Sequence, residues 1–158
     1  MKNTMLAIVF GSLFALTVWA ATAATDFSGT WTLDAAKSEG LNPQMPIDLT
    51  WVITHDTKTI KKEVKGAMAS TENYKFEGEV NEDVNRGQFS GKAKRTAKAM
   101  GEMVELKSVM TGEFSGNAIN ITNTQHLELA DGGKTLKVHQ TVDFGQGTME
   151  SKLVFTKK

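Results

Sequence analysis

Two histidines are the residues of this 158-residue sequence whose spacing most suggests chemistry. His126 and His139 stand on either side of the turn sequence ADGGK, so two antiparallel strands joined there would bring their imidazoles within reach of a shared metal ion. Both fall on the polar face of their strands, only Glu128 is a further ligand nearby, and the chain has no cysteine. Two ligands with a loose third make a poor metal site, so we expect no bound metal.

The sequence motifs of the common enzyme classes are absent. There is no Gly-x-Ser-x-Gly, no His-Glu-x-x-His, no phosphate-cradling glycine loop and no paired carboxylate motif. The acidic residues Glu77, Glu79, Glu82 and Asp83 are interpreted as part of a solvated loop. We therefore predict a protein that is not an enzyme, with no catalytic residues and no cofactor.

More informative polar residues stand at mid-strand positions of apolar faces. They are Ser108, Asn123, Gln125, Gln140 and Ser151. A buried amide or hydroxyl without a partner costs about 1 to 3 kcal/mol, so these groups must bond one another, ordered water or a ligand. Apolar walls with a few polar groups are typical of small-molecule sites. Two hypotheses stay open for the glutamines: they satisfy each other together with a water, or they contact a ligand.

Arg95 shares a strand face with Phe89 and raises a similar question. An isolated buried charge is very unfavourable, so an inward arginine needs an acidic partner or a polar opening. It could anchor an anionic ligand. The interpretation we favour is that Arg95 extends out of a barrel mouth with only its stem buried.

The elements that position these residues are strands, because apolar and polar residues alternate over 117–129 and 134–144. The ADGGK sequence between them is a strong hairpin turn. Keeping the apolar residues on one face pairs Ala130 with Thr135, and this register places Leu129 opposite Leu136, Leu127 opposite Val138, and Gln125 opposite Gln140. The same step at FGQGTM is predicted to place Phe144 opposite Met149, Val142 opposite Ser151 and Val138 opposite Phe155.

Further alternating segments are expected at 27–34, 49–55, 59–64, 69–76, 88–97 and 103–110, which gives about nine strands joined by short turns. Segment 92–110 is also rich in helix formers, so a helix there is the competing hypothesis. Gly101 and the alternation after it favour a hairpin. Sequential hairpins predict an all-β fold, a single up-and-down antiparallel barrel of about 8 to 10 strands, which removes exposed sheet edges.

The first expected strand, in DFSGTWTLDAAKS, puts Gly29 and Trp31 on one apolar face. A glycine inside a strand marks a bend or a close approach, and the tryptophan could fill the space so made. We expect both residues to be structural parts of the barrel's closed end.

The Gly29-Thr30-Trp31 motif resembles the opening of lipocalins, and FSGTWTLDAAKSEGL resembles the opening of intracellular lipid-binding proteins. Both families belong to the calycin group of ligand-holding barrels. SGTW and DGGKTL also resemble the corresponding parts of small secreted bacterial lipocalin-like proteins. These matches cover some 25 residues, and they imply a calycin-like barrel that holds a small molecule.

Two features of those families are missing. The resemblance implies an arginine near the last strand, packed over the first-strand tryptophan, but no arginine follows Arg95. The Arg-x-Tyr with which the lipid-binding proteins hold a fatty-acid carboxylate is replaced by Leu153-Val154-Phe155. Segment 35–48 is also too short for that family's helix pair.

The N-terminal segment indicates the cellular location of the protein. Residues 1–23 have one lysine, an apolar run and a small-x-small ending, which is typical of a cleaved secretory signal, with an uncleaved membrane anchor as the alternative. We expect one domain, 24–158, located in the periplasm or secreted and not inserted in the membrane. Without Lys2 the chain has 17 basic and 18 acidic residues, which argues against nucleic acid as a partner.

The sequence therefore predicts an exported binding protein that holds a small apolar or amphipathic molecule. The alternative is a scaffold, such as an inhibitor or envelope-assembly factor, that binds a protein partner through its loops. An enzyme acting on a lipid-like substrate inside the barrel is a third hypothesis. The oligomeric state is left open, and the predicted ligand-binding residues are Trp51, Tyr74, Phe89, Arg95, Leu106, Ile121, Asn123, Gln125, Val138 and Gln140.

Overall fold

Alternation of apolar and polar residues runs through nearly the whole chain, and the computed structural model, which describes residues 25–43 and 47–158, is accordingly built from strands. The predicted signal sequence lies outside the described residues. Two 3₁₀ turns accompany the strands, η1 (Ala35–Lys37) and η2 (Asp131–Gly133). The strands are β1 (Gly29–Leu33), β2 (Thr50–His55), β3 (Thr59–Lys65), β4 (Ser70–Lys75), β5 (Val80–Arg86), β6 (Phe89–Met100), β7 (Met103–Phe114), β8 (Asn117–Ala130), β9 (Thr135–Asp143) and β10 (Thr148–Lys157).

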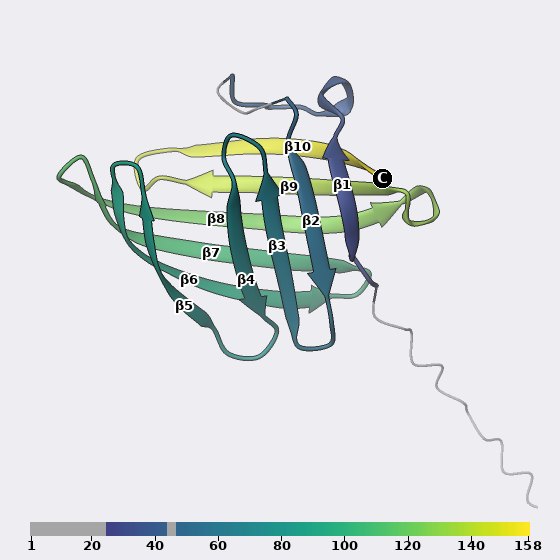
Figure 1. The fold of residues 1–158 in the computed structure, drawn as a ribbon, viewed down its shortest axis with the longest axis horizontal. Coiled ribbons are helices and arrows are strands. Elements are labelled where there is room, and N and C mark those ends of the chain that lie inside the picture. Colours follow the sequence, from purple (N-terminus) through teal and green to yellow (C-terminus); the bar gives the residue numbers. More distant parts are fainter. Residues whose placement is uncertain (1–24, 44–46) are drawn as a thin grey trace, which may run out of the picture.

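These ten strands form one antiparallel up-and-down sheet in the order β4-β3-β2-β1-β10-β9-β8-β7-β6-β5. The sheet curls into a nearly closed barrel, so its first and last members, β4 and β5, come together without a hydrogen-bonded ladder (Figure 1). A side-chain hydrogen bond spans this gap, from Asn73 Nδ2 to Glu82 Oε1 at 2.9 Å. The fold is the predicted all-β barrel.

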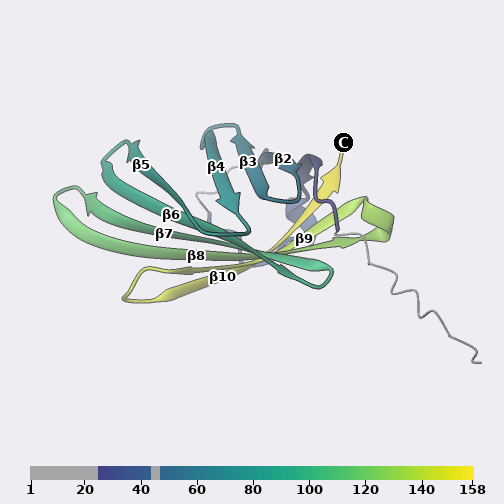
Figure 2. The ribbon, with the colours of Figure 1, turned by 90° about the horizontal axis from the view of Figure 1, so that it is seen from below.

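The barrel is flattened into two layers whose strands cross at a steep angle. Strands β1–β4 lie across β5–β10 in Figure 1, and Figure 2 shows the same two layers on edge. Because β6, β7 and β8 have 12, 12 and 14 residues and β2–β4 only six or seven, one end of the long strands extends past β4. That end carries the β5–β6, β7–β8 and β9–β10 turns.

The tryptophan of the first strand lies in the hydrophobic core of the barrel. Trp31 is fully buried, and its indole nitrogen donates to the carbonyl of Phe27 at 3.0 Å. The Nζ of Lys157 lies 5.1 Å from the Trp31 ring centroid. A Cβ at Gly29 would stand 2.6 Å from the Lys157 side chain, so the glycine makes room for it. A lysine of the last strand thus packs where the resemblance implied an arginine.

The hairpin registers are partly as predicted. Strands β8 and β9 pair as expected, with Gln125 opposite Gln140 and His126 opposite His139. The predicted β9–β10 register is wrong by two positions. The pairs observed are Val142 with Met149, Gln140 with Ser151 and Val138 with Leu153.

The cause of that shift lies in the turn. The carboxylate of Asp143 accepts the N–H of Gly145 at 2.7 Å, and the N–H of Phe144 donates to the carbonyl of Gly147 at 3.0 Å. The loop therefore begins at Phe144, one residue earlier than predicted. Face alternation is unchanged because the register moves by two.

Two other expectations concern the middle of the chain. Segment 92–110 is a hairpin, with Gly101 in the turn at a φ of 69°, so the helix alternative is wrong. The solvated-loop interpretation of residues 77–83 is also wrong in part, because strand β5 begins at Val80. Glu82 is half-buried and faces the interior, whereas Asp83 is exposed.

Candidate functional site

A band of polar side chains crosses the middle of the barrel interior, and we call it the polar belt. Two neighbouring rows of the β6–β9 ladders supply most of it, with Arg95, Ser108 and Asn123 in one row and Gln125 and Gln140 in the next. The opposite layer supplies the rest from β3 and β4. The polar belt consists of Lys62, Glu72, Tyr74, Arg95, Ser108, Asn123, Gln125 and Gln140.

Lys62 is the centre of one hydrogen-bond network in the polar belt. Its side chain is 2% exposed, and its Nζ donates to Gln125 Oε1 and lies against Glu72 Oε2, each at 2.8 Å. The same ammonium lies 4.5 Å from the Trp51 ring centroid. Gln125 Nε2 donates onward to Gln140 Oε1 at 3.2 Å. Gln125 is therefore bonded to both Lys62 and Gln140.

Glu72 and Tyr74 complete this network on β4. The Tyr74 hydroxyl donates to Glu72 Oε2 at 2.6 Å. Burial opposes ionisation of Glu72, but the charge of Lys62 and hydrogen bonds from Lys62 and Tyr74 outweigh it and hold the pKa of Glu72 at about 2. Burial and the adjacent Glu72 raise the pKa of Tyr74 well above its usual value. The network thus contains a carboxylate, an ammonium and a neutral phenol at pH 7.

Arg95 has its acidic partner inside the barrel. Its guanidinium is 2% exposed and forms an ion pair with Glu82 of β5, whose other carboxylate oxygen accepts from Asn73. The interpretation that Arg95 extends out of the mouth is therefore wrong. The carboxylate of Glu82, on the neighbouring strand β5, supplies the counter-charge that makes the buried position possible.

Two fully buried polar atoms of the belt have no hydrogen-bond partner within the described residues. They are Arg95 Nε, a donor, and Asn123 Oδ1, an acceptor, and both are buried; the one other atom of this kind in the described part is Thr32 Oγ1 on β1. Ser108 stands between Arg95 and Asn123 in the ladder. A buried donor and a buried acceptor without partners thus lie in one row of the sheet, where buried polar groups are ordinarily hydrogen-bonded.

On one side of the polar belt, toward the β6–β7 and β8–β9 turns, apolar side chains fill the interior. The rings of Trp51 and Phe155 pack against each other with centroids 4.4 Å apart. Of the residues predicted to bind a ligand, Trp51, Leu106 and Val138 are buried in this part and Tyr74 is buried in the belt. The structure places these four beneath or within the belt as its support.

On the other side, toward the β5–β6, β7–β8 and β9–β10 turns, the inward face is apolar but open, and we call it the apolar rim. Phe114 and Met149 are 49% and 44% exposed although their parity places them on the inner face, and Phe144, at the start of the β9–β10 turn, is 45% exposed. This end lies beyond β4 in Figure 2. The apolar rim consists of Phe89, Met110, Phe114, Ile119, Ile121, Val142, Phe144 and Met149.

A pair of glycines brings strands β6 and β7 close together within the apolar rim, in the same row as Ile119. Gly91 and Gly112 are opposite each other on β6 and β7. A Cβ at Gly91 would stand 2.3 Å from the Thr111 carbonyl oxygen, and one at Gly112 would stand 2.3 Å from the Ser90 carbonyl oxygen. The two strands approach too closely there for a side chain, as expected for glycines inside strands.

Sequence reasoning missed Lys62, Glu72 and Glu82. A signal was present, because Lys62 alternates with Ile60 and Glu72 with Tyr74, which places both charges on an apolar face. This alternation does not by itself predict a buried position, because a charged residue within a strand is ordinarily at the surface. These charged side chains can lie inward because each is paired with an opposite charge: Lys62 with Glu72, and Glu82 with Arg95.

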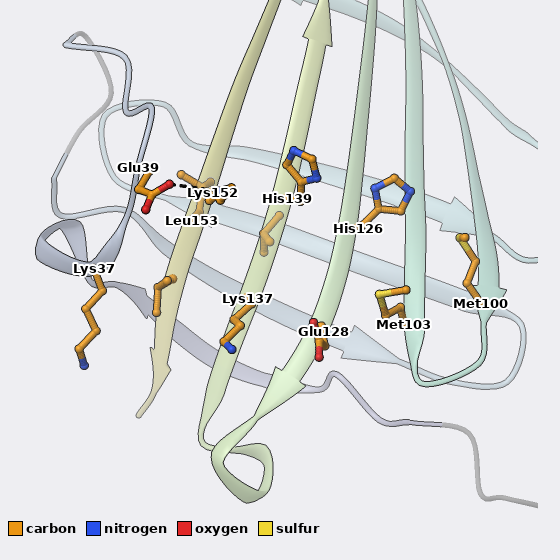
Figure 3. Close-up of a pocket in the computed structure, with 12 residues that line it drawn as sticks. Lys37, Glu39, Met100, Met103, His126, Glu128, Lys137, His139, Lys152 and Leu153 are labelled. Atoms are coloured by element: carbon orange, nitrogen blue, oxygen red, sulfur yellow. Dashed lines mark hydrogen bonds and ion pairs between the residues drawn. The ribbon is translucent and has the colours of Figure 1, made fainter.

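A hollow lined by His126 and His139 lies outside the barrel. It has a volume of about 500 Å³ and opens on the outward face of β8–β10, beside η1, and Figure 3 shows His126, His139, Lys137 and Lys152 around it. His126 pairs with Glu105 at 3.1 Å, and the two imidazole centroids are 6.4 Å apart. Within the described residues no three His, Cys, Asp or Glu side chains are arranged to hold a metal ion.

A smaller hollow, of about 110 Å³, lies at the apolar rim beside β10 and is lined in part by Gln140, Val142, Phe144, Met149 and Ser151. Another of about 260 Å³ lies at the opposite end of the barrel beside His55 and Phe76. Only the first joins belt and rim residues. No helix in the described segments is long and apolar enough to cross a membrane.

No family model matches this sequence, and no curated protein matches it. Solved structures do resemble the fold. Zebrafish ileal bile acid-binding protein in complex with cholic acid has a TM-score of 0.54 at 18% identity, over 84% of this chain and 98% of that one. The wild-type fluorescent protein UnaG has a TM-score of 0.53 at 17% identity, over 84% and 97%. A point mutant of UnaG gives 0.53 at 18% identity, over 84% and 96%.

The fold is therefore an up-and-down β-barrel similar to the folds of the bile acid-binding protein and UnaG. At such low identity this likeness concerns the fold, so the function must be argued from the polar belt and the apolar rim.

Proposed function

We propose that this protein is an exported binding protein without enzymatic activity that holds a small amphipathic molecule at the open end of its barrel. The apolar part of the ligand lies on the apolar rim, and its polar end reaches the row of Arg95, Ser108 and Asn123. Phe89, Ile121 and Gln140 of the residues predicted from sequence line this site. Trp51, Tyr74, Leu106 and Val138 support it from below.

The observation that carries the proposal is the position of the two unpartnered atoms. Arg95 Nε and Asn123 Oδ1 are buried in the belt directly below the rim. A barrel that only filled its own core would place aliphatic side chains there, because unpaired buried polar groups cost free energy. An apolar wall above a few polar groups is the usual character of a small-molecule site.

Export is proposed on the sequence of residues 1–23 alone. A charged start, an apolar run and the small residues Ala21 and Ala23 are the features that a signal peptidase reads. Mass spectrometry of protein recovered from outside the cytoplasm should find an N-terminus at Ala24 or Thr25. Retention of Met1 in a membrane fraction would show an uncleaved anchor.

Binding is tested with N-phenyl-1-naphthylamine, a neutral apolar dye whose fluorescence rises in an apolar site. The wild-type protein should bind the dye, and Ile121→Asp should weaken binding about tenfold or more, because a carboxylate on the rim must then be desolvated. Asn120→Asp is the matched control, since Asn120 is the exposed outward neighbour on the same strand. Equal affinities for both variants would contradict a site at the rim.

A second candidate function rests on the same exposed side chains. Phe114, Phe144 and Met149 stand at or beside hairpin turns, where apolar residues also suit contact with a protein partner. In this interaction role, no polar group of the partner would have to reach the polar belt. A dye that does not bind at all would favour this interaction role over ligand binding.

A further inference from the structure

We infer, resting on the proposed function, that the ligand is uncharged and carries a hydroxyl-type head group, which accepts from Arg95 Nε and donates to Asn123 Oδ1. This goes beyond amphipathic character to a class of molecule, such as a long-chain alcohol. It separates that class from fatty acids and from cationic amphiphiles of the same length.

The first support is the balance of charge in the barrel interior. Lys62 is paired with Glu72, and Arg95 is paired with Glu82. Each cation of the polar belt therefore already has a carboxylate partner. An incoming carboxylate would meet Glu82 beside Arg95, and an incoming ammonium would meet Arg95 beside Glu82, so neither gains an uncompensated counter-charge.

The second support is which atoms are left over. The Lys62 ammonium is occupied by Glu72, Gln125 and the face of Trp51. Gln125 uses its carbonyl for Lys62 and its amide for Gln140. The fully buried atoms without a partner in the row nearer the rim are one donor, Arg95 Nε, and one acceptor, Asn123 Oδ1.

A hydroxyl matches this pair because it donates one hydrogen bond and accepts others through its lone pairs. An ionised carboxylate only accepts, so it would leave Asn123 Oδ1 facing a second acceptor. An ammonium only donates, so it would leave Arg95 Nε facing a second donor. A site of this kind rejects ligands by leaving its own buried groups unpaired.

The experiment compares three probes of equal chain length by displacement of N-phenyl-1-naphthylamine from the full mature protein at pH 7.5. The probes are 1-dodecanol, used below its solubility limit, and dodecanoate and dodecyltrimethylammonium, each used below its critical micelle concentration. We expect 1-dodecanol to bind about tenfold or more tightly than either charged probe. Equal or tighter binding of dodecanoate would overturn the inference while leaving the proposed function intact. Failure of all three probes and of the dye would contradict both.

A variant makes the charge argument sharper. Glu82→Gln removes the partner of Arg95, so it should tighten dodecanoate binding by about tenfold and reduce the preference for the alcohol. Asp83→Asn is the control, because Asp83 is exposed on the outward face of the same strand and loses the same charge. An equal gain of dodecanoate affinity in both variants would show a general charge effect and overturn the assignment to Arg95.

Discussion

Lys62 Nζ and Gln125 Oε1 meet at 2.8 Å in the barrel interior, which joins β3 of one layer to β8 of the other. The contact is buried, and it brings the positive charge that Glu72 requires to the middle of the fold. Lys62 therefore links the two layers below the proposed ligand, and its removal is the first test of the polar belt.

Lys62→Met should destabilise the protein by about 3 to 5 kcal/mol, because Glu72 is left as a buried charge without its cation. Chemical unfolding in urea, followed by tryptophan fluorescence, measures this change. The double variant Lys62→Met, Glu72→Leu should recover much of the loss, since it removes both charges together. A single variant that loses less than about 1 kcal/mol would mean that the pair is solvated.

The free energy of unfolding should fall at acidic pH, over the pH range in which Glu72 becomes protonated. Its pKa is about 2 in the folded protein against an ordinary 4.5, so the carboxylate favours folding fully above pH 4.5 and loses that contribution as the pH falls toward 2. The loss should be on the order of 2 kcal/mol. Urea unfolding at pH 5, 4, 3 and 2.5 measures it.

Glu72→Gln should flatten this pH dependence. Glu63→Gln is the comparison, because the Glu63 pKa is also about 2, through hydrogen bonds and charge from Lys61 and Lys65, but that cluster lies at the surface. Solvent screens such pairs, so the Glu63 variant should keep the wild-type slope. If Glu63→Gln flattened the pH dependence and Glu72→Gln did not, the acid sensitivity would come from the surface cluster around Glu63.

Trp31→Ala should cost on the order of 3 to 5 kcal/mol, as for other large truncations in a core. The side chain is fully buried and its indole N–H is bonded to Phe27. Calorimetric or urea unfolding measures the loss. Truncation of Trp51 is unsuitable as a comparison because Trp51 also contacts Lys62. The control is Met68→Ala, which should leave the free energy of unfolding nearly unchanged because Met68 is exposed. Equal stability of the Trp31 and Met68 variants would contradict the packing described.

Gly91→Ala should destabilise the β6–β7 hairpin by about 1 to 3 kcal/mol, because its methyl group would collide with the backbone at Thr111 and Gly112. Gly147→Ala is the control, since nothing lies within 4 Å of a Cβ there. The control should change the free energy of unfolding by less than about 1 kcal/mol. Similar values for the two variants would argue against the close approach.

The fold was predictable from the sequence, but the chemistry of the interior was only partly so. Alternation over residues 117–144 fixed the β8–β9 register, because a slip of one residue would turn every apolar side chain outward. The β9–β10 register depended on a turn held by the Asp143 carboxylate, which no strand pattern encodes. Strand β5 was missed because VNEDVNR has the composition of a loop.

The same limit applies to the site. Asn123 and Gln140 stood out as polar residues on apolar faces, and the structure places both in the polar belt. Glu82 and Lys62 did not stand out, because a buried charge is explained only by its partner on another strand. The charged partner of Glu82 is Arg95, 13 positions away in the chain, and that of Lys62 is Glu72 on the neighbouring strand β4.

The most direct test of the proposed site is the methyl NMR spectrum of protein with ¹³C-labelled methionine and isoleucine methyl groups, recorded during titration with 1-dodecanol. The titration should move the signals of Met110, Met149, Ile119 and Ile121, which belong to the apolar rim, and leave Met68 and Ile47, exposed at 62% and 77% elsewhere on the molecule, in place. Shifts confined to Met68 and Ile47, or spread equally over all six residues, would contradict a ligand site at the open end of the barrel.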